Sequence, residues 1–161
     1  MKYFGILFTC SLIALAACSK DASVISSDRI TYPKAWEANA HAIFSFSISD
    51  TTTPHNIYFN LRTTEAYPFN NLFLITELAL PHGKVLGDTL EYAMAYPSGK
   101  LMGTGFGKLK ENVLIYKENY TFEEVGEYHL KVRHAMRSNN QITPVSPLSG
   151  VTDFGYQIMQ K

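Results

Sequence analysis

From residue 42 onward, apolar and polar side chains alternate along the chain with a period of two. This spacing places one face of a β-strand against a core and the other face in solvent. The alternation is clear over residues 44–48, 57–62 and 127–136. The segment 71–80 is nearly all apolar, which predicts a strand near the centre of a sheet. The chain is therefore constrained to fold mainly as β-structure.

Shorter strand-like segments complete the pattern, at residues 89–94, 113–116, 120–122 and 151–159. The segments between them are rich in turn residues, and none has the apolar spacing of an amphipathic helix. About eight strands at intervals of roughly 8–15 residues predict an all-β, antiparallel β-sandwich. Residues 122–132 resemble the corner of such sandwiches, with Gly126 making the turn and Tyr128 burying its ring. A jelly roll and an immunoglobulin-like sandwich remain equally open.

The first 17 residues have the features of a secretory signal peptide. Lys2 precedes an apolar stretch that is shorter than the about 20 residues needed to span a bilayer. The stretch ends in Leu15-Ala16-Ala17-Cys18, which looks like the lipobox of bacterial lipoproteins. We expect cleavage after Ala17 and attachment of diacylglycerol and an N-acyl chain such as palmitate to Cys18. Two or more acyl chains anchor a protein stably without a transmembrane helix.

This processing predicts three parts: a cleaved signal (1–17), a lipidated N-terminus with a flexible tether (18–30), and one β-sandwich domain (31–161). Loss of Lys2 leaves 13 of the 14 basic residues against 14 acidic ones. Such a balance argues against nucleic acid as a partner. Cys10 leaves with the signal, so the domain contains neither a free thiol nor a disulfide, and its stability must come from burial.

No catalytic, metal-binding or cofactor-binding constellation emerges from the sequence. His129 and His134 are five residues apart on one predicted strand, so they point to opposite faces and cannot chelate one ion there. The glycines at 103, 105 and 107 do not complete a phosphate-binding motif, and we interpret them as bulges or close backbone contacts. A hydrolase with carboxylates far apart in sequence stays open as a third alternative, because glycosidase acids need not be neighbours in the chain.

Three aromatic residues in predicted loops form a possible binding surface: Trp36, Tyr67 and Tyr96. Aromatic rings at the loops of a β-sandwich can stack on sugars or form a protein interface. The same rings can instead cap the ends of the core.

A long series of segments is similar to the gliding-motility lipoprotein GldH family of the Bacteroidetes. The matching segments are residues 57–62, 67–77, 81–84, 88–92, 97–100, 103–107, 110–112, 116–119, 135–137 and 150–155, in addition to the lipobox. The resemblance implies an outer-membrane lipoprotein facing the periplasm, with partners among other lipoproteins of the gliding and type IX secretion apparatus. It implies no enzymatic activity, and Cys18 is the one functional residue that it carries over.

The leading hypothesis is therefore a non-enzymatic, membrane-anchored β-sandwich that acts through protein–protein contacts. The alternative is a surface carbohydrate-binding lipoprotein that uses Trp36 and the loop tyrosines.

Overall fold

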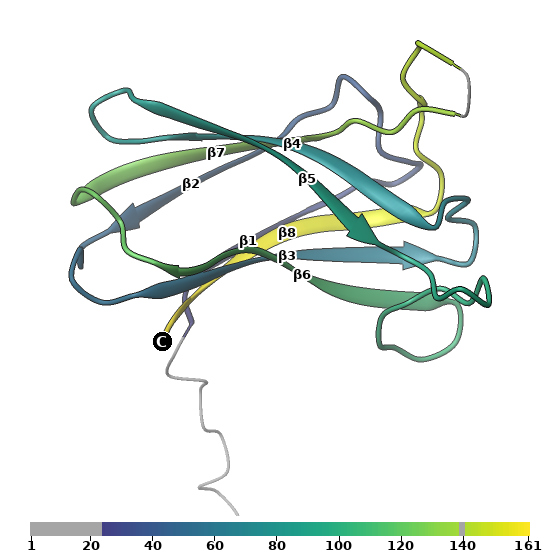
Figure 1. Ribbon diagram of the computed structural model, residues 1–161, viewed down its shortest axis with the longest axis horizontal. Helices are drawn as coiled ribbons and strands as arrows, with labels where there is room; N and C mark the ends of the chain where they lie inside the picture. The colour runs from purple at the N-terminus through teal and green to yellow at the C-terminus, as the bar shows by residue number, and fades with distance from the viewer. Residues whose placement is uncertain (1–23, 139–140) are drawn as a thin grey trace, which may run out of the picture.

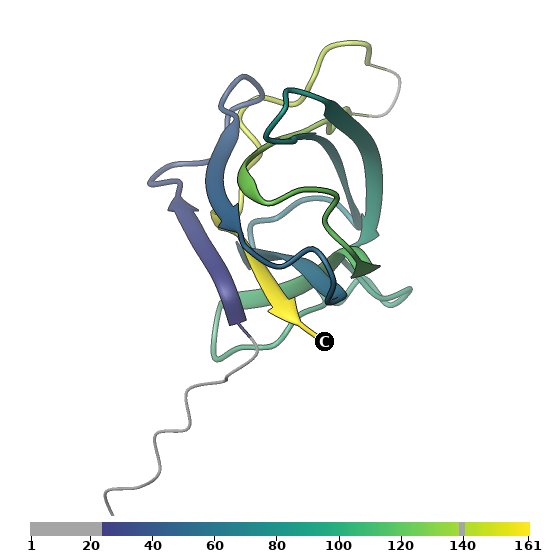
Figure 2. The same cartoon turned by 90° about the vertical axis from the view of Figure 1, so that its left-hand side faces the viewer.

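The computed structural model describes residues 24–138 and 141–161, and they form two four-stranded antiparallel sheets packed face to face (Figures 1 and 2). One sheet has the strand order β1-β8-β3-β6 and the other β2-β7-β4-β5. The strands are β1 (Val24–Thr31), β2 (Ala42–Ile48), β3 (His55–Thr64), β4 (Asn71–Ala79), β5 (Val85–Ala93), β6 (Leu109–Tyr120), β7 (Gly126–His134) and β8 (Val151–Gln160). The prediction of an all-β sandwich with about eight strands is confirmed.

The strand pairing is nested, and this distinguishes between the two predicted kinds of sandwich. β1 pairs with β8, β2 with β7, β3 with β6, and β4 with β5. Only the β4–β5 hairpin stays within one sheet, whereas every other connection crosses to the opposite sheet. An immunoglobulin-like domain instead keeps its first two strands in the same sheet. The nested order is that of an eight-stranded jelly roll.

Aromatic side chains from the inner faces of both sheets fill the core. In β2, Phe44, Phe46 and Ile48 are buried, while the intervening serines face solvent, as the alternation predicted. Phe46 stacks on Tyr128 of β7 with ring centroids 5.7 Å apart. Large aromatic rings bury much apolar area, so they supply the burial that a domain without a disulfide requires.

The predicted tether is wrong from residue 24 onward, because residues 24–31 form β1. This strand pairs with β8 in a register that places Ile30 opposite Phe154. β1 lies at the edge of its sheet and buries no side chain completely, so its sequence carries little apolar alternation. Pairing with β8 satisfies the backbone groups on one side of β1 and covers the edge that β8 would otherwise expose. Residues 18–23 of the predicted tether lie outside the described residues.

β6 is one continuous strand where the sequence predicted two short pieces. It is an edge strand whose outer face carries both apolar and charged side chains, and this mixture hid its length. The glycine-rich loop before it folds back on β6 through the Thr104–Glu111 bridge. A Cβ at Gly105, where φ is +146°, would collide with the carbonyl oxygen of Leu109. The close backbone approach is confirmed for Gly103 and Gly105, whereas a Cβ at Gly107 would meet no atom within 4 Å.

The predicted corner at Tyr128 is confirmed as well. The ring is fully buried, and its hydroxyl donates to the carbonyl oxygen of Glu124 at 2.9 Å and accepts the Glu124 N–H at 3.1 Å. Gly126 makes the turn with φ of +141°. A buried hydroxyl costs free energy unless it is hydrogen-bonded, so this pair of bonds allows the tyrosine to enter the core.

Candidate functional site

Trp36 belongs to the core and does not contribute to a binding surface. It lies in the β1–β2 connection, is 0% exposed, and forms a β-bridge with Leu148. Its ring stacks on Tyr32 at 5.2 Å and packs against Phe154 at 4.9 Å. Its indole N–H donates to the carbonyl oxygen of Ala40 at 2.7 Å. An amphipathic ring with its polar atom satisfied is well suited to closing the end of a core.

His134 lies beside Trp36 and is also buried. Its Nε2 is 3.1 Å from the Trp36 carbonyl oxygen, so the neutral ring donates this hydrogen bond. Burial lowers the pKa of His134 below its ordinary value, and Arg133 acts in the same direction, while the Trp36 carbonyl and Glu37 oppose the shift. The other histidine of this strand, His129, is exposed and contacts Ser45. The prediction that His129 and His134 point to opposite faces is confirmed.

Acidification is expected to destabilise the fold through His134. The unfolded chain protonates this histidine near pH 6.5, whereas the folded chain does so only at lower pH. The unfolded state therefore binds more protons, and the free energy of unfolding falls from pH 7 to pH 5 by at most about 1.4 kcal/mol per pH unit for this one group. Urea titrations at several pH values should show this slope, reduced in His134→Gln and unchanged in His129→Gln. Equal slopes in His134→Gln and the parent chain would contradict it.

Tyr67 is also part of the core rather than of a surface. Its ring is 4% exposed, and its hydroxyl donates to the carbonyl oxygen of Asn71 at 2.7 Å. Gly150 lies so close that a Cβ there would collide with the Tyr67 backbone. Of the three predicted aromatic residues, only Tyr96 is exposed, at 51%. The carbohydrate hypothesis thus loses two of its three rings, including Trp36, because neither is accessible to a ligand.

A groove of about 800 Å³ lies at the end of the sandwich near Tyr67. It is lined mainly by Pro68, Phe69, Asn70, Phe73, Met136 and Arg137. The segment after β7 continues along β4, since the Ala135 N–H donates to the carbonyl oxygen of Phe73 at 2.8 Å. The Phe73 N–H in turn lies 3.2 Å from the sulfur of Met136. These contacts fix the apolar floor, and Arg137 adds an exposed cation at its side.

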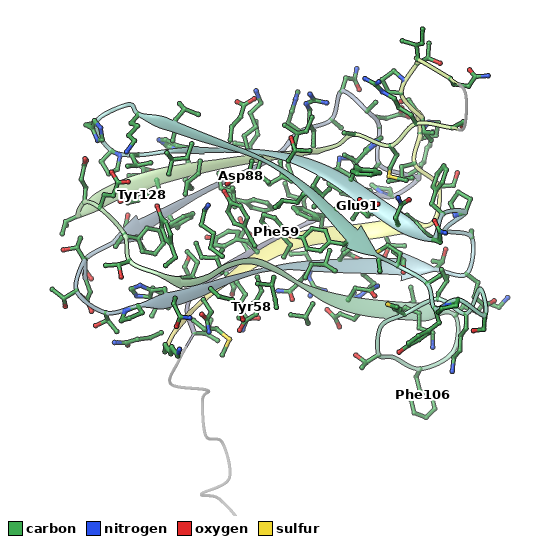
Figure 3. The ribbon with its side chains drawn as sticks, viewed as in Figure 1. Tyr58, Phe59, Asp88, Glu91, Phe106 and Tyr128 are labelled. Atoms are coloured by element: carbon green, nitrogen blue, oxygen red, sulfur yellow. The ribbon has the colours of Figure 1, made fainter. Side chains whose placement is uncertain are left out.

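A second groove, of about 710 Å³, adjoins the first, because Asn70 and Asn71 line both. It contains Tyr96 and Glu91, the latter projecting from β5 (Figure 3). The Glu91 carboxylate accepts a hydrogen bond from the Asn71 side-chain amide at 2.8 Å. Together the two grooves hold this single carboxylate, whereas glycoside hydrolysis generally uses two.

Three connections far apart in the sequence build the two grooves. They are the β3–β4, β5–β6 and β7–β8 connections, which all lie at one end of the sandwich (Figure 1). The sequence prediction included Tyr96 but missed Phe69, Phe73, Met136 and Arg137. The signal that could have found them is the set of segments 67–77, 97–100 and 135–137, which carry the family resemblance and meet here.

Two further segments that carry the family resemblance, 88–92 and 116–119, lie close together between the edge strands β5 and β6. Asp88 there faces the interior of the sandwich (Figure 3). The Asp88 carboxylate accepts from the Tyr116 hydroxyl at 3.2 Å and from Lys117 Nζ at 3.0 Å. The Tyr92 hydroxyl donates to the carbonyl oxygen of Ile115 at 2.7 Å. Burial raises the pKa of Tyr116, and the nearby Asp88 charge acts in the same direction. This cluster joins the two sheets along their open side and has a structural role.

The described ranges contain no group of three or more His, Cys, Asp or Glu side chains that could hold a metal ion. Over the same residues, no helix is long and apolar enough to cross a membrane. Cys18, the predicted lipidation site, lies outside the described residues.

The nested strands and the grooves at one end define the protein as a jelly-roll domain with two adjoining, partly aromatic grooves. Its sequence assigns it to one family of lipoproteins. The family model described as GldH lipoprotein matches residues 23–158, and the chain belongs to this family.

Two relatives are similar over nearly their whole length. A protein described as gliding motility lipoprotein GldH, from Flavobacterium johnsoniae, is 39% identical over 161 residues, covering 100% of this chain and 98% of the relative. A protein described as a GldH homolog, from Christiangramia forsetii, is 37% identical over 152 residues, covering 94% and 92%. The predicted family resemblance is confirmed.

Among solved structures, the VP2 subviral particle of infectious bursal disease virus is similar with a TM-score of 0.39 and 16% identity. The match covers 84% of this chain, which spans only 32% of the VP2 chain. A likeness at this TM-score carries no argument about function.

Proposed function

We propose that this protein is an outer-membrane lipoprotein that acts without catalysis, by binding another envelope protein of the gliding-motility and type IX secretion machinery through its loop-end grooves. The observation that carries the proposal is the pair of adjoining grooves lined by Phe69, Phe73 and Tyr96. Membership of the GldH lipoprotein family and the lipobox ending at Cys18 support the anchor and the setting.

The lining of the first groove favours a protein ligand. Aromatic residues and Arg are enriched at protein interfaces, and this groove presents Phe69 and Arg137 beside the buried Met136. Arg137 is exposed, and no carboxylate within the described ranges forms a salt bridge with it. The first groove holds no acidic side chain of its own. A partner segment with an apolar side chain for the floor and a carboxylate for Arg137 would match this chemistry.

The anchor sets where such a partner would be found. Diacylglycerol and an N-acyl chain at Cys18 would hold the domain at one membrane surface. We place that surface at the periplasmic face of the outer membrane, as the family resemblance implies. The partner is then a protein that reaches the same face.

Site-specific photocrosslinking in living cells tests the contact. A photoreactive phenylalanine analogue at position 69 is expected to yield a discrete adduct with one envelope protein. The same analogue at Ser47, which is exposed on β2, should yield none. Adding Arg137→Glu should reduce the adduct about tenfold, because interface hot spots typically contribute more than 1 kcal/mol. No adduct at position 69, or equal adducts at both positions, would contradict the proposal.

A further inference from the structure

The β5–β6 connection presents one phenylalanine entirely to solvent. Phe106 is 103% exposed and lies between Gly105 and Gly107. In Figure 3 its ring projects away from the domain, on the outer side of the β1-β8-β3-β6 sheet, the side on which Tyr58 also lies. Phe106 makes no aromatic contact with the rest of the described domain. The core therefore gives no reason for an aromatic side chain at this position.

Exposed apolar side chains continue from Phe106 along β6, interrupted on the same face by Glu111, whose carboxylate forms salt bridges with Arg29 and Arg62. Leu109, Val113 and Ile115 all point to the outer face of this edge strand, and Val113 is 62% exposed. The solvent face of an antiparallel sheet is ordinarily polar. We call Phe106, Leu109, Val113 and Ile115 the β6 apolar strip.

Lysines flank the strip. Lys100 and Lys108 are exposed on either side of Phe106, and Lys110 is half-buried at the start of β6. None of the three forms a salt bridge within the described residues. An aromatic and aliphatic surface bordered by free cations is the composition that binds the headgroup region of an anionic membrane.

The length of chain before β1 limits the distance between this sheet and the anchor. Five residues separate Cys18 from Val24, the first residue of β1, so even a fully extended chain spans only about 20 Å. The ten residues of β3 alone extend over about 33 Å. A membrane that holds Cys18 therefore lies within about 20 Å of the start of β1. This distance is shorter than the length of the sandwich. β1 belongs to the same sheet as β6, and its start lies at the end of that sheet opposite Leu109. The anchor and Phe106 therefore reach one bilayer when the sheet lies along the membrane.

We propose that the β6 apolar strip is a second membrane contact, with Phe106 inserted into the acyl–headgroup boundary of the bilayer that carries the Cys18 anchor. This inference rests on the lipid anchor of the proposed function. The contact orients the domain, with the β1-β8-β3-β6 sheet toward the membrane and the other sheet toward the compartment. The loop-end grooves, to which β4 and the segment after β7 contribute, then stay accessible to a partner.

Fluorescence quenching of the lipidated protein in vesicles tests the contact. Phe106→Cys would give the mature chain a single free thiol, because Cys10 is removed and Cys18 is acylated. This thiol would carry an environment-sensitive fluorophore in vesicles of phosphatidylethanolamine and phosphatidylglycerol, with nitroxide-labelled acyl chains as quencher. Ile142→Cys is the matched control. Ile142 is an apolar residue that is 88% exposed, and the β7–β8 connection that holds it lies away from the β1-β8-β3-β6 sheet (Figures 1 and 2).

We expect the fluorophore at position 106 to shift to the blue and to lose at least about half of its emission to the quencher, as for a side chain buried about 5–10 Å into the interface. The fluorophore at position 142 should keep its emission. Protein that floats with the vesicles but shows no quenching at position 106 would overturn the membrane contact and leave the anchor intact. Equal quenching at both positions would overturn the proposed orientation, and protein that fails to float would overturn the anchor and the contact together.

Discussion

Cys18→Ser, expressed behind an ordinary cleavable signal in place of residues 1–17, is expected to move the protein from the membrane fraction to the soluble envelope fraction. The sulfur of Cys18 is the predicted attachment atom for diacylglycerol, and a serine hydroxyl at this position does not receive the lipid. Without acyl chains, only the β6 apolar strip would contact the bilayer. Even one myristoyl chain gives only marginal, reversible binding, so one phenylalanine and three half-exposed aliphatic side chains cannot replace the anchor.

Cys10→Ser is the matched control for this expectation. Cys10 lies within the segment that cleavage removes, so the variant should remain in the membrane fraction with an unchanged mature mass. Fractionation followed by mass spectrometry of the mature N-terminus measures both properties. Recovery of the Cys18→Ser protein in the membrane fraction would contradict the lipid anchor.

Trp36→Ala is expected to lower the free energy of unfolding by about 3–5 kcal/mol, the usual cost of truncating a buried tryptophan. The substitution removes the ring that packs against Tyr32 and Phe154, and it leaves the Ala40 carbonyl without its indole donor. Because domains are typically stable by about 5–15 kcal/mol, this loss is a large part of the total. Urea unfolding followed by circular dichroism is the suitable measurement, since Trp36 is the only tryptophan and the variant has no indole fluorescence.

Tyr96→Ala is the control that shows how much the free energy of unfolding changes when an exposed aromatic ring is removed. Tyr96 is exposed at the second groove, so its removal should change the free energy of unfolding by no more than about 0.5 kcal/mol. Similar losses in the two variants would show that Trp36 is not the core residue that its contacts indicate.

Most strands could be predicted because their evidence is local. In β2, the alternation of Phe44, Phe46 and Ile48 with serines reflects a strand with one buried and one solvated face. β1 and β6 are different: β1 buries no side chain completely, and the outer face of β6 mixes apolar with charged side chains. The sequence pattern therefore predicts a tether where β1 forms and two short pieces where β6 is continuous.

The candidate site was largely beyond sequence reasoning. An aromatic residue in a loop has no periodicity that reveals whether its ring points inward, so Trp36 and Tyr67 were grouped with Tyr96. The groove also depends on contacts between Phe73 and the Ala135–Met136 segment, which are more than sixty residues apart. Only the family resemblance, which connects residues 67–77 with 135–137, marked these segments in advance.

The sequence by itself determined the β-class of the domain and the family, and it predicts an anchor at Cys18, because a period of two, a long series of matched segments and a lipobox can each be read along the chain. The tertiary structure decided the jelly-roll order, since the pairing of β1 with β8 joins the two ends of the domain. It also decided which aromatic residues are buried in the core and which are exposed on the surface. Trp36 is enclosed by the rings of Tyr32 in its own connection, His134 in β7 and Phe154 in β8, whereas Phe106 has no neighbour that covers it. That difference depends on burial, which is a property of the folded chain.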